Sequence, residues 1–573
     1  MPFNPQPSNC RNWATDILLL TLAIGALYFI WLGGYPLFTP DEGRYSEVAR
    51  EMLASGDFIT PRVNGVAFLD KPVLYYWLQA LAMYWFGIHE WAVRFFPALY
   101  GVAGCLAVYV AGRRLFDRRT GVLSAIILAT TPLYFCTSHY ANLDLEIAVL
   151  ITVSLLSFLL ATGASGKSRS ALFVLAYIFA GLGFLTKGLI AIAFPAMIGG
   201  LWILLLSRWR LLTSMRLGLG VVIVLAITLP WFVLVQRANP EFLHFFFVTQ
   251  QVTRFLSAAE FNNPSPHWFY VPVIIVGFLP WAAFLLQSLF SQIRSCWQAR
   301  EEHTATLFLL IWAMVVFTFF SIPHSKTISY IIPIFPALAL LVGHQLAVNW
   351  DKSQADCGLK LAMSLFVIFN TLLAAAFFAL PYYQWMDIAL SATPTLFMVG
   401  SVLGFSAIIV TLFWRRLRVS SLFYICTLTS AAMLLSLTMG ATHLNPNSAK
   451  PLVKKLETIL QPTDTVVNYF KFYQDVPLYL KRTIILVADW ESPTIAERDN
   501  WVRELWYSMP FQNTDEILLN ETAFWKRWHS DETMYVFVNK NYLDQFQSHT
   551  KQVHVIGRHE DIILIGNHSR MTN

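Results

Sequence analysis

The chain has 573 residues, of which 56% are hydrophobic and only 13% are charged, and its mean hydropathy is +0.53. These values exclude an ordinary soluble globular protein. The net charge of +6 comes from basic residues in the loops. No basic run lies beside a motif that reads nucleic-acid sequence, which argues against nucleic-acid binding. The six cysteines are scattered without a C-x-x-C pair, which argues against a disulfide framework or a cysteine-based zinc site.

Hydropathy predicts a polytopic α-helical membrane protein with about thirteen spans. Each apolar stretch is long enough to cross a bilayer. Lipid-exposed backbone must form its hydrogen bonds within a helix, so these stretches are predicted to be helices. The predicted spans are residues 14–34, 91–112, 120–137, 142–163, 171–186, 188–206, 215–236, 269–290, 304–322, 328–347, 358–380, 392–414 and 419–440.

Basic residues occur in every second connection between these spans. Short loops rich in Lys and Arg stay in the cytoplasm. The N-terminus is therefore predicted to be cytoplasmic and the C-terminal tail to lie outside. The clusters are Arg11, Arg113-Arg114 with Arg118-Arg119, Lys167 with Arg169, Arg208 with Arg210 and Arg216, Arg294 with Arg300, Lys352 with Lys360, and Arg415-Arg416 with Arg418.

Two external loops and a C-terminal region complete the predicted organisation. The loops 35–90 and 237–268 are too long to be turns, so a function is expected of them. After residue 440 the hydropathy falls, and the pattern predicts a small α/β domain over 441–573, beside a transmembrane domain over 1–440. Its predicted elements are a helix at 448–460 and strands at 465–470, 483–488, 534–538 and 562–566.

The first loop opens with Thr39-Pro40-Asp41-Glu42, which reads as a capping box with proline at the first helical position. Asp41 shares one helical stripe with apolar and aromatic residues, whereas the other acids point elsewhere: Tyr45, Val48 and Met52 lie on the stripe, and Glu42, Glu47 and Glu51 lie off it. An acid on such a stripe is costly without a partner or a task. A substrate role for Asp41 and a simple complement to the helix dipole both stay open.

Further charged residues follow, and each alone has a structural explanation. Lys187, at the short turn between the fifth and sixth spans, has no evident partner, and snorkelling explains it. A lone histidine at a membrane interface, such as His267, is more often structural than a metal ligand. Taken together, however, some of these residues predict an external cluster of cations and donors facing Asp41 and Asp144, suited to a phosphate at the membrane surface: Lys71, Arg254, Lys326 and Tyr330.

With these motifs, the sequence resembles the aminoarabinose transferases, the lipid A-modifying members of the polyprenyl-phosphate-dependent GT-C class of membrane glycosyltransferases. The resemblance covers nearly the whole chain, and its first-loop motif is quite specific. It rests on Thr39 to Tyr45, Arg50-Glu51-Met52, Ser55-Gly56-Asp57, Lys71-Pro72, Arg254-Phe255, Ser325-Lys326, Tyr330, Pro333 and Leu478-Tyr479-Leu480-Lys481-Arg482.

This resemblance implies a bacterial inner-membrane enzyme, expected to be a monomer, with thirteen helices and a periplasmic α/β domain. It would move 4-amino-4-deoxy-L-arabinose from undecaprenyl phosphate to a lipid A phosphate on the periplasmic face. Resistance to cationic peptides such as polymyxin would follow, because lipid A gains an amine. By motif, the catalytic acids would be Asp41 and Asp144, the donor-phosphate ligands Lys71, Arg254 and Tyr330 with Lys326, and the substrate contacts Glu42, Tyr45 and Asp70.

The implied chemistry places cations against the departing undecaprenyl phosphate, where they stabilise the transition state. A lipid A phosphate is already an oxyanion near neutral pH, with its second pKa near ~6, and needs little help from a base. Asp41 is therefore expected to hold or orient substrate, pairing with the ammonium of the donor sugar.

Two departures from the family pattern leave alternatives open. The family usually has Glu where this chain has Asp70, and an acid and His where it has Gln250-Gln251. Such Glu and His residues can bind zinc, and Asp70 with His267 would be the substitute here for zinc or another divalent metal; no other cofactor is expected. Another sugar, such as galactosamine, or a protein Ser/Thr acceptor is an alternative, the latter with Asp41 as general base. A lipid-linked sugar transporter is disfavoured, because the charges lie at the surface and not at mid-membrane.

Overall fold

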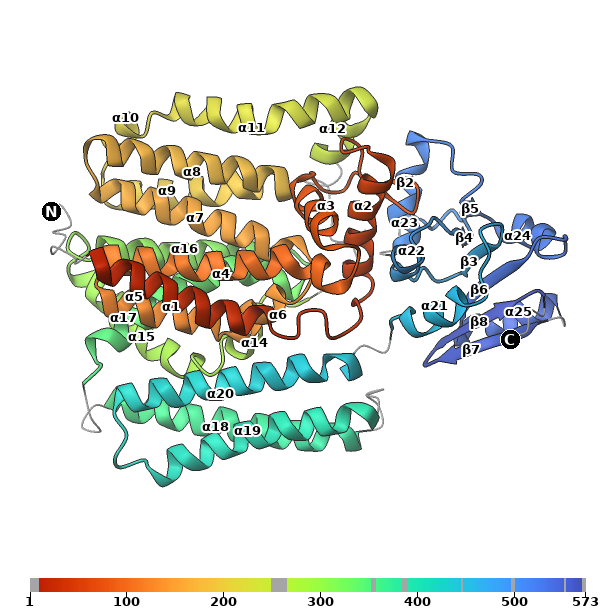
Figure 1. Cartoon of the computed structure of the whole chain (residues 1–573). Coiled ribbons are helices and arrows are strands. Elements are labelled where there is room, and N and C mark those ends of the chain that lie inside the picture. Colours follow the sequence, from red (N-terminus) through yellow and green to blue (C-terminus); the bar gives the residue numbers. More distant parts are fainter. Residues whose placement is uncertain are drawn as a thin grey trace. The chain divides into compact units, whose positions relative to one another are not determined.

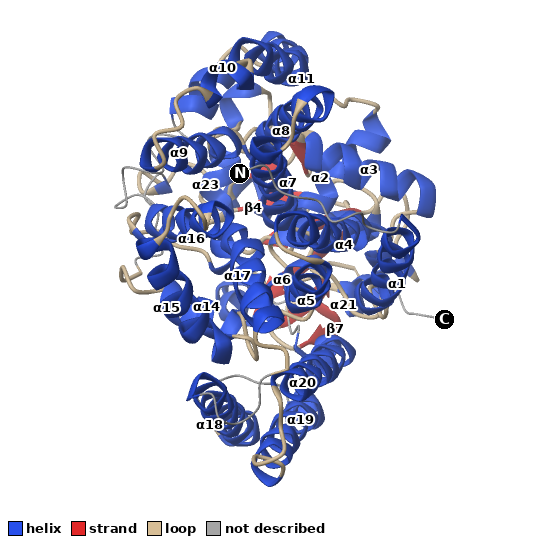
Figure 2. Ribbon diagram, turned by 90° about the vertical axis from the view of Figure 1, so that its left-hand side faces the viewer, coloured by secondary structure: helices blue, strands red, loops and turns tan. Residues whose placement is uncertain are grey.

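The computed structural model describes residues 10–248, 265–351, 357–383, 390–444, 447–495, 500–550 and 553–568. The chain divides into two compact units (Figures 1 and 2). The first unit comprises Met1–Leu32, Arg94–Pro230 and Ser265–Leu444, and the second comprises Gly33–Val93, Trp231–Pro264 and Asn445–Asn573.

The first unit is built from helices, many of which run side by side in Figure 1. Helices α7 and α8 pack along one another, and α18, α19 and α20 form a separate group in Figure 2. The elements are α1 (Cys10–Phe29), most of α4 (Glu90–Leu115), α5 (Arg118–Ala129), α6 (Pro132–Ser138), α7 (Leu143–Gly163), α8 (Gly166–Lys187), α9 (Ile190–Leu205), α10 (Leu211–Met215), most of α11 (Leu217–Ala238), α14 (Tyr270–Gly277), α15 (Ala282–Gln298), α16 (Thr304–Ser321), η2 (Ile328–Ile334), α17 (Phe335–Val348), α18 (Cys357–Ala379), η3 (Leu380–Tyr382), η4 (Leu390–Ala392), α19 (Thr393–Leu412), α20 (Val419–Gly440) and η5 (Ala441–Leu444).

The helical membrane fold predicted from hydropathy is confirmed. Ten helices among the described residues are long and apolar enough to cross a membrane, and up to twelve spans result if each of two bent helix pairs counts as one. The predicted span 120–137 is bent by 65° between α5 and α6, and 269–290 by 115° between α14 and α15. Pro132 and Pro280 lie at these breaks, where proline removes a backbone donor. The 188–206 stretch contains the shorter helix α9, so the number thirteen stays a prediction.

The second unit joins the first-loop residues to a sheet domain. Its elements are α2 (Asp41–Ser55), β1 (Arg62–Val63), β2 (Val66–Ala67), α3 (Leu74–Phe86), α12 (Phe242–His244), α21 (Lys450–Glu457), β3 (Thr465–Tyr469), α22 (Asp475–Leu480), β4 (Ile485–Val487), α23 (Trp501–Trp506), η7 (Met509–Phe511), β5 (Leu518–Leu519), α24 (Glu521–Trp528), β6 (Met534–Asn539), η8 (Lys540–Tyr542), α25 (Leu543–His549), β7 (His554–His559) and β8 (Ile562–Gly566).

The main sheet has the strand order β5-β4-β3-β6-β8-β7, in which β3 to β6 are parallel and β7 and β8 pair antiparallel. The four predicted strands correspond to β3, β4, β6 and β8, and α21 lies within the predicted helix. Strand β5 escaped prediction because it has two residues, and β7 because its side chains are mostly exposed. A small C-terminal sheet domain is thus confirmed. Its boundary at residue 440 stays a prediction.

A helix starts at the predicted motif, but α2 begins at Asp41, one residue after the predicted first helical position Pro40, and its cap differs from the predicted capping box. Pro40 is the N-cap and accepts no side-chain hydrogen bond. The hydroxyl of Thr39 instead donates to the carbonyl of Asn447 at 3.3 Å. Glu42 Oε2 accepts from the backbone N–H of Phe38 at 2.7 Å, so the acid alone reaches back over the helix start.

The expectation that the remaining acids of α2 point away from the packed stripe is wrong. Glu42 and Glu47 are both fully buried. These acids are buried because α2 packs against α3, α22 and β1, which together cover most sides of the helix.

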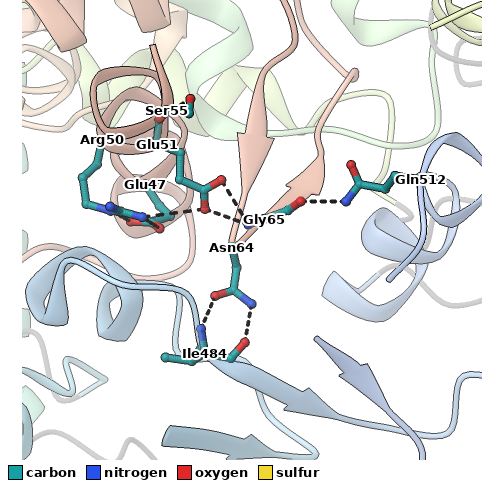
Figure 3. A network of polar contacts seen from close by, with 8 residues as sticks. All are labelled: Glu47, Arg50, Glu51, Ser55, Asn64, Gly65, Ile484 and Gln512. Atoms are coloured by element: carbon teal, nitrogen blue, oxygen red, sulfur yellow. Dashed lines mark hydrogen bonds and ion pairs between the residues drawn. The ribbon is translucent and has the colours of Figure 1, made fainter. Parts of the chain in front are cut away.

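Arg50 pairs with two of the acids of α2, Glu47 and Glu51 (Figure 3). Its guanidinium donates twice to Glu47, at 2.7 and 2.6 Å, and lies 3.8 Å from Glu51. Burial raises the pKa of Glu47 well above its usual value, although Arg50 opposes this shift. Both carboxylate oxygens of Glu51 accept from the N–H of Gly65, so the Arg50-Glu51 pair of the family motif fastens the β1-β2 turn to α2.

That turn is also fastened to the sheet domain within the same unit (Figure 3). The Asn64 side chain bonds both backbone groups of Ile484, each at 2.8 Å, as a neighbouring strand would. Asn64 and Gly65 have φ of 53° and 77°, the conformation that a two-residue hairpin turn requires and that Asn and Gly tolerate best. The carbonyl of Gly65 accepts from Gln512 at 2.6 Å.

Candidate functional site

In the first unit the predicted acid Asp144 is the centre of a buried polar cluster. It lies in the first turn of α7, where Asn142 caps the helix by accepting the Asp144 N–H at 2.5 Å. One carboxylate oxygen of Asp144 forms an ion pair with Lys187, and the other accepts from the Ser329 hydroxyl. The Asp144 side chain is 7% exposed and that of Lys187 is 18% exposed. Removing either charge would leave the other without its partner in a low-dielectric site.

The predicted phosphate ligand Tyr330 belongs to this cluster. The Lys187 ammonium lies 4.3 Å from the centroid of its ring, within cation–π range. Tyr330 also contacts Phe320, with ring centroids 5.8 Å apart. Helices α7, α8 and the short helix η2 thus bring an acid, a cation and a phenol together at one point.

Lys187 was expected to snorkel without a partner, and this expectation is wrong. A two-residue connection joins α7 to α8, so the first turn of α7 and the last turn of α8 lie at the same end of the pair. The predicted spans 142–163 and 171–186 are also joined by a short connection, so the sequence already indicated that Asp144 and Lys187 lie at the same end of the pair. No comparable signal pointed to Ser329, which comes from a distant part of the chain.

A second acid of α7 lies beside this cluster. Glu146 is almost completely buried, and Oε1 accepts from the Thr186 hydroxyl at 3.0 Å. Thr186 precedes Lys187 in the sequence, so the two acids of α7 meet two consecutive residues of α8. Within the described part of the chain, Glu146 Oε2 has no hydrogen-bond partner.

Lys326 and His267 are engaged with backbone groups. The Lys326 ammonium donates to the carbonyls of Ser265 and Pro323, at 3.0 and 2.5 Å. Burial lowers the pKa of Lys326. His267 Nδ1 lies 3.1 Å from the carbonyl oxygen of Ser321. The predicted phosphate-binding role of Lys326 stays a prediction, because both contacts are structural.

In the second unit, Asp41 is held by Arg44. Their side chains are 2.6 Å apart, and the same guanidinium donates to both carboxylate oxygens of Glu504 at 2.5 Å. Burial lowers the pKa of Arg44, but the carboxylates of Glu504 and Asp41 outweigh it and the pKa lies above its usual value. Arg44 also lies over the Tyr45 ring, 5.0 Å from its centroid. Glu504 is a member of this site that the sequence pattern did not indicate.

Asp70 and Lys71 lie in the same unit as Asp41. Asp70 is buried, and the Lys71 ammonium donates to the Asp70 carbonyl at 3.2 Å. Tyr45 packs edge-on against Tyr75, with ring centroids 5.9 Å apart. Arg254 and Gln250-Gln251 lie outside the described residues. The predicted cluster of Lys71 and Arg254 with Tyr330 therefore stays a prediction.

The family motif of the sheet domain has a structural explanation. The Tyr479 hydroxyl accepts from the Leu37 N–H at 3.1 Å and donates to Glu90 at 3.0 Å. Lys450 forms an ion pair with the same Glu90 carboxylate. Arg482 donates to the Asp464 carbonyl at 2.8 Å. These contacts hold the second unit together and touch none of the predicted site residues.

The described residues contain no group of three His, Cys, Asp or Glu side chains placed to hold a metal ion. Zinc sites need at least three protein ligands. Asp70 and His267, the predicted pair, belong to different units. A metal held by Asp70 and His267 stays a prediction, and no metal enters the function proposed below.

Comparison with known proteins bears on both units. A family model described as dolichyl-phosphate-mannose-protein mannosyltransferase matches residues 70–234. A relative from Edwardsiella ictaluri, named undecaprenyl phosphate-alpha-4-amino-4-deoxy-L-arabinose arabinosyl transferase, is 35% identical over 58% of this chain and 58% of its own. A relative of the same name from Pseudomonas paraeruginosa is 33% identical over 67% of this chain and 69% of its own.

The chain belongs to this arabinosyltransferase family. The resemblance inferred from the motifs is thereby confirmed. The alignments with the relatives from Edwardsiella ictaluri and from Pseudomonas aeruginosa strain UCBPP-PA14 span 58% and 60% of those proteins. The segment matched by the broader mannosyltransferase model contains Asp70, Lys71, Asp144 and Lys187, whereas Asp41 and Tyr330 lie outside it.

A solved structure of the family extends the likeness to nearly the full arabinosyltransferase chain. It is ArnT from Cupriavidus metallidurans bound to undecaprenyl phosphate, 26% identical, with a TM-score of 0.82 over 96% of this chain and 98% of that one. The apo form of the same protein gives a TM-score of 0.81. The fold expected from the resemblance, helices with a small sheet domain, is confirmed.

Proposed function

We propose that this arabinosyltransferase-family chain transfers 4-amino-4-deoxy-L-arabinose from undecaprenyl phosphate to a lipid A phosphate. The observation that carries the proposal is the likeness over nearly the whole chain to ArnT bound to undecaprenyl phosphate. The buried Asp144–Lys187 pair beside Tyr330 supports it, because a held cation and a phenol are groups that bind phosphate.

In the proposed reaction an oxygen of the lipid A phosphate attacks C1 of the sugar, and the C1–O bond to undecaprenyl phosphate breaks. The leaving group departs as an anion with the electron pair of that bond. The attacking oxygen is already ionised near neutral pH. Catalysis then consists of holding the two phosphates and stabilising the negative charge that moves to the donor phosphate.

We assign Asp144 to positioning within this scheme. Both of its carboxylate oxygens are engaged, one with Lys187 and one with Ser329, which fixes the carboxylate in place. The carboxylate fixes the Lys187 ammonium near the Tyr330 ring. Lys187 and the Tyr330 hydroxyl are the proposed ligands of a phosphate in the first unit, and Lys71 and Arg254 are the predicted ligands elsewhere in the chain.

Asp41 receives a related role. Arg44 pairs with both Asp41 and Glu504, so one guanidinium faces two carboxylates. Asp41 is thus a fixed hydrogen-bond acceptor beside more negative than positive charge. We propose that it orients substrate by pairing with the ammonium of the aminosugar. Turnover of a donor analogue that lacks the amine tests this role. Wild-type rates that are equal with and without the amine would contradict it.

The same proposal includes topology and partners. We propose a cytoplasmic N-terminus, a monomeric chain in the bacterial inner membrane, and an active site with the sheet domain on the periplasmic side. The alternating basic connections support this orientation. Reaction of a single introduced cysteine in the 441–573 region with a membrane-impermeant thiol reagent in intact spheroplasts tests it, and protection until lysis would contradict it.

Mass spectrometry of lipid A tests the reaction. A strain that lacks its own aminosugar transferase would express the chain, its Asp41→Asn and Asp144→Asn variants, or Asp515→Asn as a matched exposed control. A mass gain of one aminopentose, lost in the first two variants and kept in the control, is the expected result. A gain of another sugar would retain the mechanism and change the donor. Unmodified lipid A at confirmed expression would contradict the acceptor.

A second candidate function is glycosyl transfer to a protein Ser or Thr. It is favoured by the match of residues 70–234 to the protein mannosyltransferase model. Such hydroxyls need a general base, a role that Asp41 would have to supply while it is paired with Arg44. Glycoproteomic comparison of cells with and without the chain separates the two functions.

A further inference from the structure

The topology of the sheet domain contains a switch point. Along the chain, β3 is followed by β4 and then β5 on one side, after which β6 returns to pair with the other side of β3. Figure 1 shows these strands adjacent in the sheet domain. In open parallel α/β sheets, ligands bind in the crevice outside the carboxyl ends of the strands at such a reversal.

A pocket lies at this position. Its volume is about 270 Å³, and its lining comes from the segments that follow three neighbouring parallel strands, together with the start of α23. Phe470 and Lys471 follow β3, Ala488 and Asp489 follow β4, and Tyr542 follows β6. We call this cavity the sheet pocket; the remaining lining residues are Asn500, Trp501 and Val502.

Rigid aromatic side chains form much of the sheet pocket. The rings of Phe470 and Tyr542 are stacked, with centroids 5.5 Å apart and an interplanar angle of 29°. Trp501 is held edge-on by Trp490, with centroids 5.6 Å apart. Such packing fixes the rings before a ligand arrives, so little conformational entropy is lost when an apolar ligand face contacts them.

Two charged side chains complete the lining. Lys471 is half-buried, and its ammonium lies 5.4 Å from the centroid of the Tyr473 ring. Among the described residues it makes no hydrogen bond, and the Asp561 carboxylate, which forms an ion pair with Lys540, acts on it only through its charge. A partly desolvated ammonium gains strongly from a directly bound anion. Asp489, directly after β4, is exposed and makes no ion pair within the described part of the chain.

The backbone at this pocket is strained. Phe470 has φ of 53°, a conformation that aromatic residues rarely adopt. Its N–H donates to the Val487 carbonyl at 2.9 Å, which ties the strained residue to β4. Strain of this kind is costly and concentrates at ligand sites. Here it places the Phe470 side chain in the pocket lining.

We propose that the sheet pocket binds a single sugar ring that carries an anionic group. The aromatic rings provide a platform for the apolar face of a pyranose, and Asp489 accepts hydrogen bonds from its hydroxyls. Lys471 binds the anion. The volume lies just below that of pockets for drug-sized ligands, which restricts the occupant to one ring. The head of a phosphorylated glycolipid and a soluble sugar phosphate share this chemistry.

The inference does not rest on the transfer reaction, because it is tested by binding. The full chain in nanodiscs of neutral phospholipid would be titrated with glucosamine 1-phosphate and, separately, with glucosamine, and saturation-transfer NMR would record binding. We expect the phosphorylated probe to bind about tenfold more tightly than glucosamine, since a charge-assisted hydrogen bond is added.

Three variants locate the site. Trp501→Ala and Lys471→Gln are expected to weaken binding of the phosphorylated probe about tenfold, and Lys471→Gln to abolish its advantage over glucosamine. Lys454→Gln, an exposed lysine outside the pocket, is the matched control and should bind as the wild type does. Circular dichroism and the thermal unfolding midpoint confirm that each variant is folded. Absent binding, or binding unchanged in both pocket variants, would overturn the proposal.

A last arm distinguishes the two ligand sources. Nanodiscs that contain lipid A would be compared with nanodiscs of neutral phospholipid. Competition of lipid A with glucosamine 1-phosphate identifies the lipid head as occupant, and unaltered probe binding identifies a soluble sugar phosphate. Loss of lipid A modification in cells with binding intact would count against the proposed function alone.

Discussion

The carboxylate of Asp144 and the ammonium of Lys187 form an ion pair that joins the first turn of α7 to the last turn of α8. The pair is nearly buried, and Ser329 completes the hydrogen bonding of the acid. The Asp144 side chain is therefore fixed inside the protein and not solvated, although it lies at the start of a helix. Lys187, which was expected to snorkel, is a cation held in place beside the Tyr330 ring.

Breaking this pair should affect stability and transfer differently. Asp144→Asn leaves Lys187 without its carboxylate, and loss of one partner of a buried pair costs about 3–5 kcal/mol. The double variant Asp144→Asn with Lys187→Met should recover most of that stability but not the transfer of aminosugar. Thermal unfolding and lipid A mass spectrometry measure the two effects. Recovery of transfer in the double variant would show that the pair is only structural.

Arg44 should tolerate no replacement by lysine. Its planar guanidinium meets Asp41 and both oxygens of Glu504 at once, which a point charge cannot do. Arg44→Lys and Glu504→Ala are each expected to lower transfer about tenfold. The double variant should be no worse than the singles, because both act on the position of Asp41. Additive losses in a transfer assay would contradict this coupling, and Asp515→Ala serves as the exposed control.

Gly43 should be intolerant of alanine. A Cβ there would lie 2.7 Å from the backbone nitrogen of Asp475 and 2.8 Å from the carbonyl carbon of Gln474. Alanine gains up to ~1 kcal/mol in helix propensity, but overpacking costs about 1–3 kcal/mol and the backbone of α22 cannot yield easily. Gly43→Ala is therefore expected to lower the unfolding midpoint. Gly218→Ala, where no atom lies within 4 Å, should not lower it.

Asn64 should stabilise the fold more through its side-chain hydrogen bonds than through its positive φ angle. Removal of its two hydrogen bonds leaves the N–H and carbonyl of Ile484 unpaired, at a cost of about 2–4 kcal/mol. Asn64→Gly keeps the positive φ and loses both bonds, whereas Asn64→Ala loses both and adds strain. Both variants should be destabilised by a similar amount, with Ala slightly worse. A wild-type unfolding midpoint for Asn64→Gly would contradict the assignment.

Asp475 should make stability depend on pH. Burial raises its pKa to about 7, although Oδ2 accepts hydrogen bonds from the Ser448 hydroxyl and the Ala449 N–H. The folded state therefore keeps a proton that the unfolded chain, with a pKa near 3.8, releases. Stability from this group is fully present at low pH, falls as pH rises from about 4 to 7, and is constant above.

Asp475→Asn should remove that dependence, because the amide oxygen can still cap α21 and carries no charge. The stability of the variant relative to the wild type should rise between pH 5 and pH 8, by no more than about 3 kcal/mol, and the unfolding midpoint records this rise. The exposed control Asp515→Asn should retain the wild-type profile. An unchanged slope in the Asp475→Asn variant would show that another group dominates this pH range.

The helices of the first unit were predictable because hydropathy and length are local properties. In lipid, the backbone of a single apolar stretch can form all its hydrogen bonds only as a helix. The apolar stretches 142–163 and 171–186 therefore predicted α7 and α8 directly. The strands β3, β6 and β8 were predictable for a similar reason, since they are short apolar runs between turns. Breaks at Pro132 and Pro280 changed the geometry of two spans without changing their composition.

The partners of the charged residues were decided by the tertiary structure. Helical periodicity placed Asp41 on the apolar stripe of α2 and the other acids away from it, yet Glu42 and Glu47 are the more buried because several elements cover the same helix. Glu504 and Ser329 meet Arg44 and Asp144 from distant segments. Periodicity reports one face of one helix, whereas an ion pair depends on which distant segment packs there, and that is settled only when the chain folds.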